Sequence, residues 1–412
     1  MITVCGGRKR FIRNIAYDMK VVDLFCGAGG MSLGFKRAGF ELVCAVDNWP
    51  AALECYKLNF KRHPVRQLDI SNWEAVAMEL KESKPDIVIG GPPCQDFSDA
   101  GLRVEGKRAK LTSCFAHIVA TLQPKYFVME NVPRALKSKA YAEAEGIFKN
   151  AGYGLTKVIL DASLCGVPQA RSRFFCIGAK GAPDGFLSDA LLFDVGIVPM
   201  SVRDYLGDEI DVKYYYRHPR SYARRAIFSI DEPSATIRGC NRPMPETYVR
   251  HPADAADPVR HRLRCLTYQE RARIQTFPAN YKWTGSECNV NQIIGNAVPV
   301  NLALFVARHL KEFIESNCVV KVVPQTFSMW LSNSKQLSKA AAGDVISHYR
   351  RAAKIGECGS QKEVSLEALQ KCSGFKRSGQ DARRQMVHAC DLRQEYLLYV
   401  QNFKKGNQNE GE

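Results

Sequence analysis

The chain contains 412 residues, of which 46% are hydrophobic and 24% charged, a composition that excludes a disordered or fibrous protein. A chain of this length is too long to fold around one ordinary hydrophobic core, so we expect two or three domains. Lys and Arg number 58 and Asp and Glu 42, which gives a net charge of +16 and indicates a polyanionic partner, most often nucleic acid.

The cysteines and the apolar segments restrict the class of protein further. Fifteen cysteines are scattered along the chain without a C-x-x-C pair, which favours reduced thiols in a cytoplasmic protein and argues against a zinc cluster. No apolar run reaches the ~18 residues of a membrane span. The basic start, residues 8–13, is not followed by the apolar segment of a signal peptide. We therefore expect no membrane association and no metal.

Taken in chain order, the sequence begins with residues 1–18, which we interpret as a basic leader. From residue 19 to 182, short apolar segments alternate with amphipathic ones, and this alternation predicts an α/β domain with a doubly wound, mostly parallel sheet. The expected strands lie at 21–25, 42–46, 86–89, 126–129 and 173–178. The expected helices lie at 31–38, 50–60, 72–81, 112–122 and 140–150.

The pattern changes in the second half of the chain. Residues 183–290 are rich in Pro, Arg, Tyr and Gly with poor periodicity, which predicts a smaller irregular domain suited to nucleic acid. Residues 299–315 form an amphipathic helix pattern opened by Pro299, so we assign 291–326 to the first domain. Residues 327–412 are polar and helix-prone, and predict a helical extension of unassigned role.

Chemistry-bearing residues follow the first three strands. Glycines at 27, 29 and 30 form a G-x-G-G turn between a strand and a helix, where backbone N–H groups can approach a ligand. Asp47 ends the second strand, and Asp69 follows Gln67-Leu68 at the end of a further expected strand, between those at 42–46 and 86–89. Carboxylates at these positions suit ribose hydroxyls, so the three strand ends together indicate an adenosine-containing ligand, although each alone could be an ordinary turn.

Later strand ends carry reactive groups. Cys94 follows Gly91-Pro92-Pro93, a stiff loop that directs the thiol, although a buried structural cysteine is the common alternative. Glu130 ends another strand and is expected to face the same crevice. In an extended strand, Gln169, Arg171 and Arg173 would share one face, although an exposed edge strand would also accommodate them. Asn296 is either a helix cap or a ligand contact.

These segments, in this order, resemble the cytosine-5 DNA methyltransferases, particularly the bacterial modification enzymes. The resemblance covers roughly residues 20–310. It is carried by DLFCGAGG (23–30), GPPCQDFS (91–98), ENV (130–132), QARSR (169–173), RCLTYQERARIQTFP (264–278) and GNAVPVNLA (295–303). It implies the fold of the S-adenosylmethionine-dependent methyltransferases and sequence-specific methylation of carbon 5 of cytosine in double-stranded DNA, as protection against a cognate restriction enzyme.

The resemblance also implies S-adenosylmethionine as the methyl donor and a monomeric enzyme in the bacterial cytoplasm, bound to the nucleoid through DNA. Family members often have Trp after the ribose-binding acid, but here Asn48 stands there with Trp49 one position later, which leaves the adenine stacking partner open. The residues expected around the donor are Phe25, Gly27, Gly29, Asp47, Asn48, Asp69, Leu111, Asn296 and Val298.

The implied mechanism uses covalent attack on a base flipped out of the duplex. Cys94 would attack C6, Glu130 would neutralise the charge at N3, Arg171 would orient the base at O2, and Arg173 would hold Glu130 or the Cys94 loop. The basic loop 96–110 and the recognition region 185–260 would contact DNA. Their candidate contacts are Arg103, Lys107, Arg108, Arg217, Arg220, Arg238 and Arg242.

Three other functions compete with this interpretation. An amino-methyltransferase would carry an aromatic residue where this chain has Cys94. An RNA (tRNA) cytosine-5 methyltransferase would share the fold, and the Arg-rich region discriminates weakly against it. A non-catalytic DNA-binding regulator would retain the scaffold, but every catalytic position here holds a competent residue.

Overall fold

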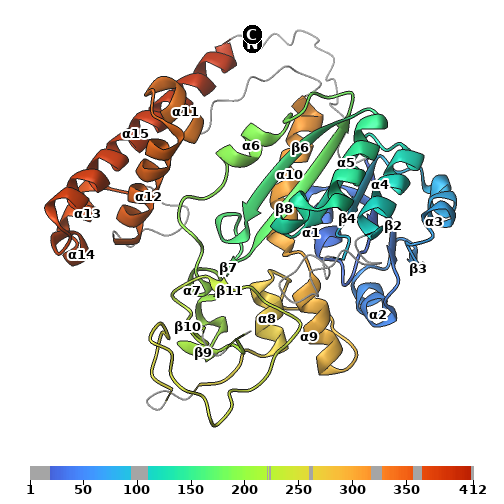
Figure 1. Ribbon diagram of the computed structural model, residues 1–412, viewed down its shortest axis with the longest axis horizontal. Helices are drawn as coiled ribbons and strands as arrows, with labels where there is room; N and C mark the ends of the chain where they lie inside the picture. Colours follow the sequence, from blue (N-terminus) through green and yellow to red (C-terminus); the bar gives the residue numbers. More distant parts are fainter. Residues whose placement is uncertain are drawn as a thin grey trace, which may run out of the picture.

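The computed structural model describes residues 19–93, 110–219, 221, 224–258, 263–316, 327–355 and 364–409. Its centre is a seven-stranded sheet in the order β3-β2-β1-β4-β5-β8-β6 (Figure 1). The strands are β1 (Lys20–Leu24), β2 (Glu41–Asp47), β3 (Val65–Gln67), β4 (Ile87–Gly90), β5 (Tyr126–Asn131), β6 (Tyr153–Asp161) and β8 (Ser172–Lys180). The first five are parallel and β8 runs antiparallel to both of its neighbours, which confirms the predicted mostly parallel sheet.

Helices cover both faces of the sheet. The helices of the sheet domain are α1 (Gly30–Ala38), α2 (Pro50–Asn59), α3 (Trp73–Leu80), α4 (Lys110–Leu122), α5 (Lys139–Asn150) and α10 (Val300–Ser316). Alternate strand residues belong to two hydrophobic clusters, one shared with α1 and α10 and the other shared with α3, α4 and α5. Because both faces are buried, the strands are almost continuously apolar.

The strand order reverses between β1 and β4, and this point positions the functional groups. Leu24 pairs with Gly90, and Gly90 pairs with Met129, so the turns after β1 and β4 and the end of β5 lie side by side. In open α/β sheets, ligands bind in the crevice outside the carboxyl ends of the strands at such a switch point.

An irregular region lies below the sheet in Figure 1. Its elements and those that connect to it are β7 (Gln169–Ala170), α6 (Ser188–Phe193), α7 (Val202–Leu206), β9 (Tyr214–Tyr216), β10 (Ile227–Ser229), β11 (Ser234–Ala235), α8 (Tyr268–Ile274) and α9 (Glu287–Asn296). Short 3-10 helices occupy Lys81–Ser83, Pro133–Lys137, Ala162–Leu164 and Gly207–Glu209. β9 and β10 form an antiparallel pair, and β11 pairs in parallel with β7. Regular structure is sparse here, as the poor periodicity predicts.

The C-terminal residues form a helical extension beside α6 (Figure 1). Its helices are α11 (Phe327–Ser334), α12 (Lys339–Ile355), α13 (Leu366–Lys371), α14 (Ser373–Lys376) and α15 (Gln380–Asn409). It has its own buried side chains, among them Tyr349, Met386 and Tyr396. It meets the rest of the chain at Phe193, whose ring lies 5.9 Å from that of Tyr396, and at Ile197 and Val198.

Among the residues that the structure describes, one helical stretch, Glu287–Ser316, is apolar and long enough to cross a membrane. It consists of α9 and α10, and 67% of its apolar window is buried inside the protein, as in the core helices of water-exposed domains. It therefore carries little weight as a membrane span.

Candidate functional site

The turn after β1 has an open side and a packed side. Phe25 adopts φ +59°, a left-handed conformation that is unusual for a bulky residue, and Gly27 follows with φ +53°. A Cβ added to Gly27 would meet nothing within 4 Å, whereas one added to Gly30 would lie 2.2 Å from the carbonyl oxygen of Val298. Gly30 is therefore required by packing, and Gly27 leaves space in which a ligand can approach the backbone.

Asp47 is fixed at the end of β2 against this turn. Its Oδ2 accepts a hydrogen bond from the backbone N–H of Gly27 (2.8 Å) and its Oδ1 accepts one from Trp49 (2.9 Å). Burial raises the pKa of Asp47, and these backbone hydrogen bonds oppose that increase. Each carboxylate oxygen accepts more than one hydrogen bond, so Asp47 can still bind hydroxyl groups of a ligand.

An apolar wall lies beside these polar groups. Phe25, Leu68 and Leu111 are half-buried and pack against the same hydrophobic cluster, between the ends of β1 and β3 and the start of α4. Asp69 is exposed, and its Oδ1 accepts the backbone N–H of Ser71 at 2.9 Å. Half-buried apolar groups next to an exposed carboxylate suit a flat aromatic group with polar edges.

The neighbouring aromatic residue points elsewhere. Asn48 is exposed, and Trp49 packs beside Ala28, Ala52, Ile293 and Trp283. Trp49 thus joins α2 to α9 at the base of the glycine turn.

The 295–299 segment reaches the glycine turn from the far end of the sequence. Val298 is buried, and its carbonyl oxygen lies next to Gly30. Asn296 is the last residue of α9; it is exposed, and its Oδ1 accepts a hydrogen bond from Gln292 (3.0 Å). The structure therefore brings Val298 into contact with the turn and leaves Asn296 at its rim.

Glu130 lies at the end of β5 and is 8% exposed. Its Oε1 lies 2.8 Å from Nε of Arg173, which is one of the two contacts that the resemblance implies for Arg173. Burial raises the pKa of Glu130, while the charges of Arg173 and then Arg171 oppose that increase. The result is a buried carboxyl group that holds a proton more readily than an exposed one.

The Gly91-Pro92-Pro93 loop lies directly against Glu130. A Cβ on Gly91 would be 3.0 Å from Glu130 Oε2, and the side-chain amide of Asn131 donates to the carbonyl of Pro92 at 3.3 Å. Cys94 directly follows Pro93 in the sequence. Cys94 itself lies outside the described residues, as do Arg103, Lys107, Arg108 and Arg220.

Gln169, Arg171 and Arg173 do not lie on one continuous strand. β7 ends at Ala170 and β8 begins at Ser172, so Arg171 lies between two strands. Gln169 bonds to Gln275 (2.7 Å) and to the backbone N–H of Ile237 (2.9 Å). Arg173 instead pairs with Glu130. The three side chains, which were expected to share one face of a strand, therefore contact different partners.

Arg171 is buried and binds main-chain carbonyl groups. Its Nη1 donates to Ile237 (3.1 Å), and its Nη2 donates to Gly295 (3.2 Å) and Ala297 (3.1 Å). These bonds connect the irregular region to the turn that contacts Gly30. Arg171 thus supports the wall of the crevice.

Two residues at this junction have no role in the sequence-based predictions. Gln275 donates to the carbonyls of Ile294 (2.6 Å) and Ala297 (3.1 Å). Arg271 is buried and bonds to Asn291 and to the carbonyl of Arg238, and burial lowers its pKa to about 10. The available signal was their separation by four residues, which places both on one face of α8 and its continuation.

A buried series of hydrogen-bonded polar groups below the glycine turn was also not predicted from the sequence. Ser32 donates to Asp23 Oδ2 (2.6 Å), and its hydroxyl lies 2.7 Å from that of Tyr56, which is 3.0 Å from Nε2 of His63. Burial raises the pKa of Asp23 to about 7, against the opposing hydrogen bond from Ser32. A carboxyl in the middle of a buried strand was the signal in the sequence.

Arginines gather in the irregular region. Burial and the charges of Arg242, Arg238 and Arg217 lower the pKa of His218, so these three arginines lie near it. Arg217 donates to the carbonyl of Thr236 (2.7 Å), Arg238 donates to that of His218, and Arg242 is exposed. The structure brings together three of the four predicted contacts of this region.

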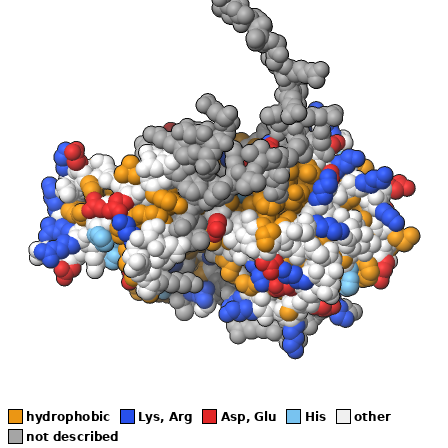
Figure 2. Space-filling model, turned by 90° about the horizontal axis from the view of Figure 1, so that it is seen from above, with side chains coloured by type: hydrophobic (Ala, Val, Ile, Leu, Met, Phe, Trp, Pro, Cys, Tyr) orange, Lys and Arg blue, Asp and Glu red, His pale blue; other side chains and the backbone are white. Residues whose placement is uncertain are grey.

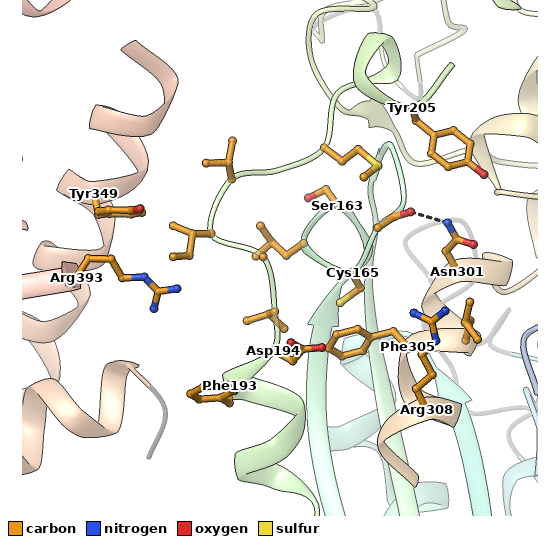
Figure 3. A pocket seen from close by; sticks show the side chains of 18 of the residues that line it. Ser163, Cys165, Phe193, Asp194, Tyr205, Asn301, Phe305, Arg308, Tyr349 and Arg393 are labelled. Carbon is orange, nitrogen blue, oxygen red and sulfur yellow. Dashed lines mark hydrogen bonds between the residues drawn. The ribbon is translucent and has the colours of Figure 1, made fainter. Parts of the chain in front are cut away.

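Two further features lie apart from this site. In the described part of the chain, no group of three or more His, Cys, Asp or Glu side chains could hold a metal ion. A cavity of about 760 Å³ separates the extension from the sheet domain, with Tyr349 and Arg393 on one side and Asn301 and Arg308 on the other (Figure 3). It contains none of the residues of the crevice.

Comparison with known sequences identifies the family of the chain. The family model described as C-5 cytosine-specific DNA methylase matches residues 19–312. The chain is 52% identical over 297 residues to the Type II methyltransferase M.HgiDI of Herpetosiphon aurantiacus, covering 72% of this chain and 95% of that protein. It is 50% identical over 296 residues to M.HindV of Haemophilus influenzae, covering 72% and 97%.

Solved structures share the fold. A putative DNA modification methyltransferase encoded within an E. coli prophage is similar with a TM-score of 0.55 and 24% identity, over 72% of this chain and 100% of that one. The S. pombe Dnmt2 methyltransferase is similar with a TM-score of 0.54 and 23% identity, over 73% and 99%.

Proposed function

The chain belongs to the C-5 cytosine-specific DNA methylase family, and we propose that it methylates cytosine in a specific sequence of double-stranded DNA, as the modification enzyme of a bacterial restriction system. The observation that carries the proposal is the placement of Glu130. This buried carboxyl group lies against the loop that leads into Cys94, at the same sheet edge as the glycine turn. The proposed site of action is the bacterial cytoplasm, and the proposed enzyme is a monomer that uses no metal.

S-adenosylmethionine is the proposed donor, and the residues of the crevice fit it. Gly27 leaves its backbone open, Asp47 can accept ribose hydroxyls, and Phe25 and Leu111 offer apolar surface for adenine. When bound, it supplies an electrophilic methyl group on a sulfonium centre. Gly29, Asn48, Asp69, Asn296 and Val298 complete the proposed set.

Cys94 starts the reaction in the proposed mechanism. Its thiolate forms a bond to C6 of cytosine, and the electron pair of the C5–C6 bond moves into the ring towards C5 and N3. Glu130 places its proton at N3 and prevents negative charge from accumulating there. The raised pKa of Glu130 supports this role because burial favours the protonated carboxyl group over the carboxylate.

Release restores the aromatic ring. Once C5 carries the methyl group, the N3 proton returns to Glu130 and a base removes the C5 proton. The electron pair of the C5–H bond forms the C5–C6 double bond, and the bond from C6 to sulfur breaks with Cys94 leaving as the thiolate. Arg173 keeps Glu130 in place throughout. In the proposed mechanism, Arg171 also contacts O2 of the base, in addition to its three hydrogen bonds to main-chain carbonyl groups.

Access to the base requires that it leave the duplex. We propose that the loop containing Arg103, Lys107 and Arg108 closes over the flipped base. Region 183–290 would read the sequence and bind phosphates through its cluster of arginines. That cluster comprises Arg217, Arg220, Arg238 and Arg242, of which three lie near His218.

The test is covalent trapping. The protein is incubated with S-adenosylmethionine and a duplex containing 5-fluorocytosine, whose fluorine cannot be removed as a proton, so a stable adduct with Cys94 is expected on a denaturing gel. Bisulfite sequencing of plasmid from expressing cells gives the recognised sequence. An adduct with RNA but not DNA would establish the RNA methyltransferase alternative, and DNA methylation by a Cys94→Ser protein would exclude the covalent route.

A further inference from the structure

We propose that the far end of the C-terminal extension is a second phosphate-binding surface, which holds the DNA duplex outside the recognised sequence. This inference rests on the proposed function, since it takes DNA as the substrate. We call this end the distal basic surface. Its exposed cations are Arg350, Arg351, Lys354, Lys371, Lys376, Arg377 and Arg384.

The extension is an addition to the family's catalytic unit. The family model ends at residue 312, and 72% of this chain already covers 95% and 97% of two relatives. The described residues 327–355 and 364–409 contain 13 Lys and Arg but only five Asp and Glu. The extension is therefore strongly basic and not needed for the shared chemistry.

Helix packing explains why these cations are exposed to solvent. On α12, Tyr349, Ala352 and Ala353 are buried against α15, which leaves Arg350, Arg351 and Lys354 outside. On α15, Met386, Ala389 and Cys390 are buried, which leaves Arg384 and His388 exposed.

α14 adds further cations at the same end. A Cβ on Gly374 would lie 3.2 Å from a methyl group of Ile355, so α14 lies directly against the end of α12. Lys376 and Arg377, which follow Gly374 in the sequence, are also exposed. Figure 2 shows Lys and Arg side chains gathered at the left end of the molecule, where the extension lies.

A shallow hollow of about 500 Å³ opens on this surface along α15. It is lined by Gln380, Arg383, Arg384, Val387, His388 and Asp391. Two guanidinium groups, an amide and an imidazole are donors that suit phosphate oxygens, and the single carboxylate of Asp391 opposes them.

The chemistry of the surface favours a polyanion over a protein partner. Stable protein interfaces need large apolar anchors at their centre. Among the described residues of the extension, one large apolar side chain is mostly exposed. This residue is Leu398, which lies 14 residues along α15 from Arg384. Exposed cations spread over four helices instead match the repeated charges of a DNA backbone.

The position of the surface predicts a dependence on DNA length. Tyr396 packs against Phe193 of α6, and Arg384 lies 12 residues before Tyr396, about 18 Å along the helix axis at 1.5 Å per residue. The distal basic surface therefore projects away from the domain that carries the crevice (Figure 1). A duplex that only covers the recognised sequence would not reach it.

The test compares two full-length double variants. In one, Arg351→Gln and Arg384→Gln remove two charges from the distal basic surface. In the control, Lys20→Gln and Lys81→Gln remove two exposed charges at the opposite edge of the sheet, where β1 and β4 begin. Affinity is measured against KCl concentration for duplexes of about 14 and about 40 base pairs, at roughly 3.4 Å per base pair.

On the longer duplex, we expect the slope of log affinity against log salt to fall by about 2 for the first variant, because each lost phosphate contact removes about 0.9. At about 0.1 M salt this amounts to a loss of up to roughly 60-fold in affinity. The control variant should match the unmodified protein, and turnover on the short duplex should be unchanged in both. Equal slopes for all three proteins on the longer duplex would overturn the inference, even if the surface were then found to bind a protein partner. Trapping on the short 5-fluorocytosine duplex reports the proposed function separately.

Discussion

Arg173 and Glu130 form a nearly buried ion pair, 2.8 Å between Nε and Oε1, on two adjacent antiparallel strands. Despite this pairing, the pKa of Glu130 is raised, since burial outweighs the favourable charge. The pair therefore fixes the carboxyl group in place without abolishing its ability to carry a proton.

Replacing Glu130 by Gln should lower the rate of methyl transfer by about 10²–10⁴-fold, the usual contribution of a positioned proton donor. The amide retains the shape of the side chain but cannot transfer a proton to N3. Single-turnover methylation with the donor in excess measures this step. Glu145→Gln is the matched control because Glu145 pairs with Lys157 (2.7 Å) away from the crevice. A Glu130→Gln enzyme with the full rate would remove Glu130 from the mechanism.

Replacing Arg173 by Met should move the alkaline limb of the pH–activity profile to higher pH. Arg173 lowers the pKa of Glu130, so its removal lets burial raise that pKa further and keeps the group protonated to higher pH. The measurement is kcat/KM against pH, with Lys157→Met as a control for loss of a surface charge. A limb that stays in place or moves to lower pH would contradict the assignment of this limb to Glu130.

The stability of the protein should depend on pH through Asp23. Its pKa is about 7 in the folded chain and about 3.9 when unfolded, so its contribution is present below the unfolded value and is lost as pH rises through the folded one. The full effect is about 4 kcal/mol by linkage. Asp23→Asn should remove this component, so the free energy of unfolding of the variant relative to the parent should increase from pH 5 to pH 8. A difference that is constant with pH would show that Asp23 does not titrate in this range.

Two glycine substitutions should separate packing from donor binding. Gly30→Ala places a methyl group 2.2 Å from the carbonyl of Val298, and such overpacking typically costs about 1–3 kcal/mol. Gly27→Ala meets no neighbouring atom and costs about 1–2 kcal/mol for its positive φ. Its methyl group instead occupies the open side of the turn. Thermal unfolding and titration with S-adenosylmethionine should show the larger stability loss for Gly30→Ala and the larger affinity loss for Gly27→Ala. The reverse order would place the donor elsewhere.

Much of the crevice could be predicted because its residues follow strands that were recognisable from their apolar runs. Gly27, Asp47 and Glu130 stand at strand ends, and in a parallel sheet these ends share one edge. The helix expected at 299–315 is α10, Val300–Ser316, because its apolar spacing is regular. Local pattern and topology were sufficient for these features.

Partners remote in sequence were not predictable. The side chain of Arg171 binds carbonyl groups of residues 237, 295 and 297, and no local pattern encodes that meeting. β6, Tyr153–Asp161, was missed because glycines at 152 and 154 interrupt its start and Ile159 is exposed at the sheet edge. The cluster around Asp23 likewise depends on three elements that pack together only in the fold.

The contact of Gly30 with Val298 has a consequence for the order in which the enzyme is made. α1 leaves the ribosome before α10, which packs against it and begins more than 260 residues later. A nascent chain therefore holds the glycine turn uncovered on one side until synthesis has passed the whole irregular region. Translation products that end before Val298 should then be inert towards DNA, and methylation should require synthesis past α10.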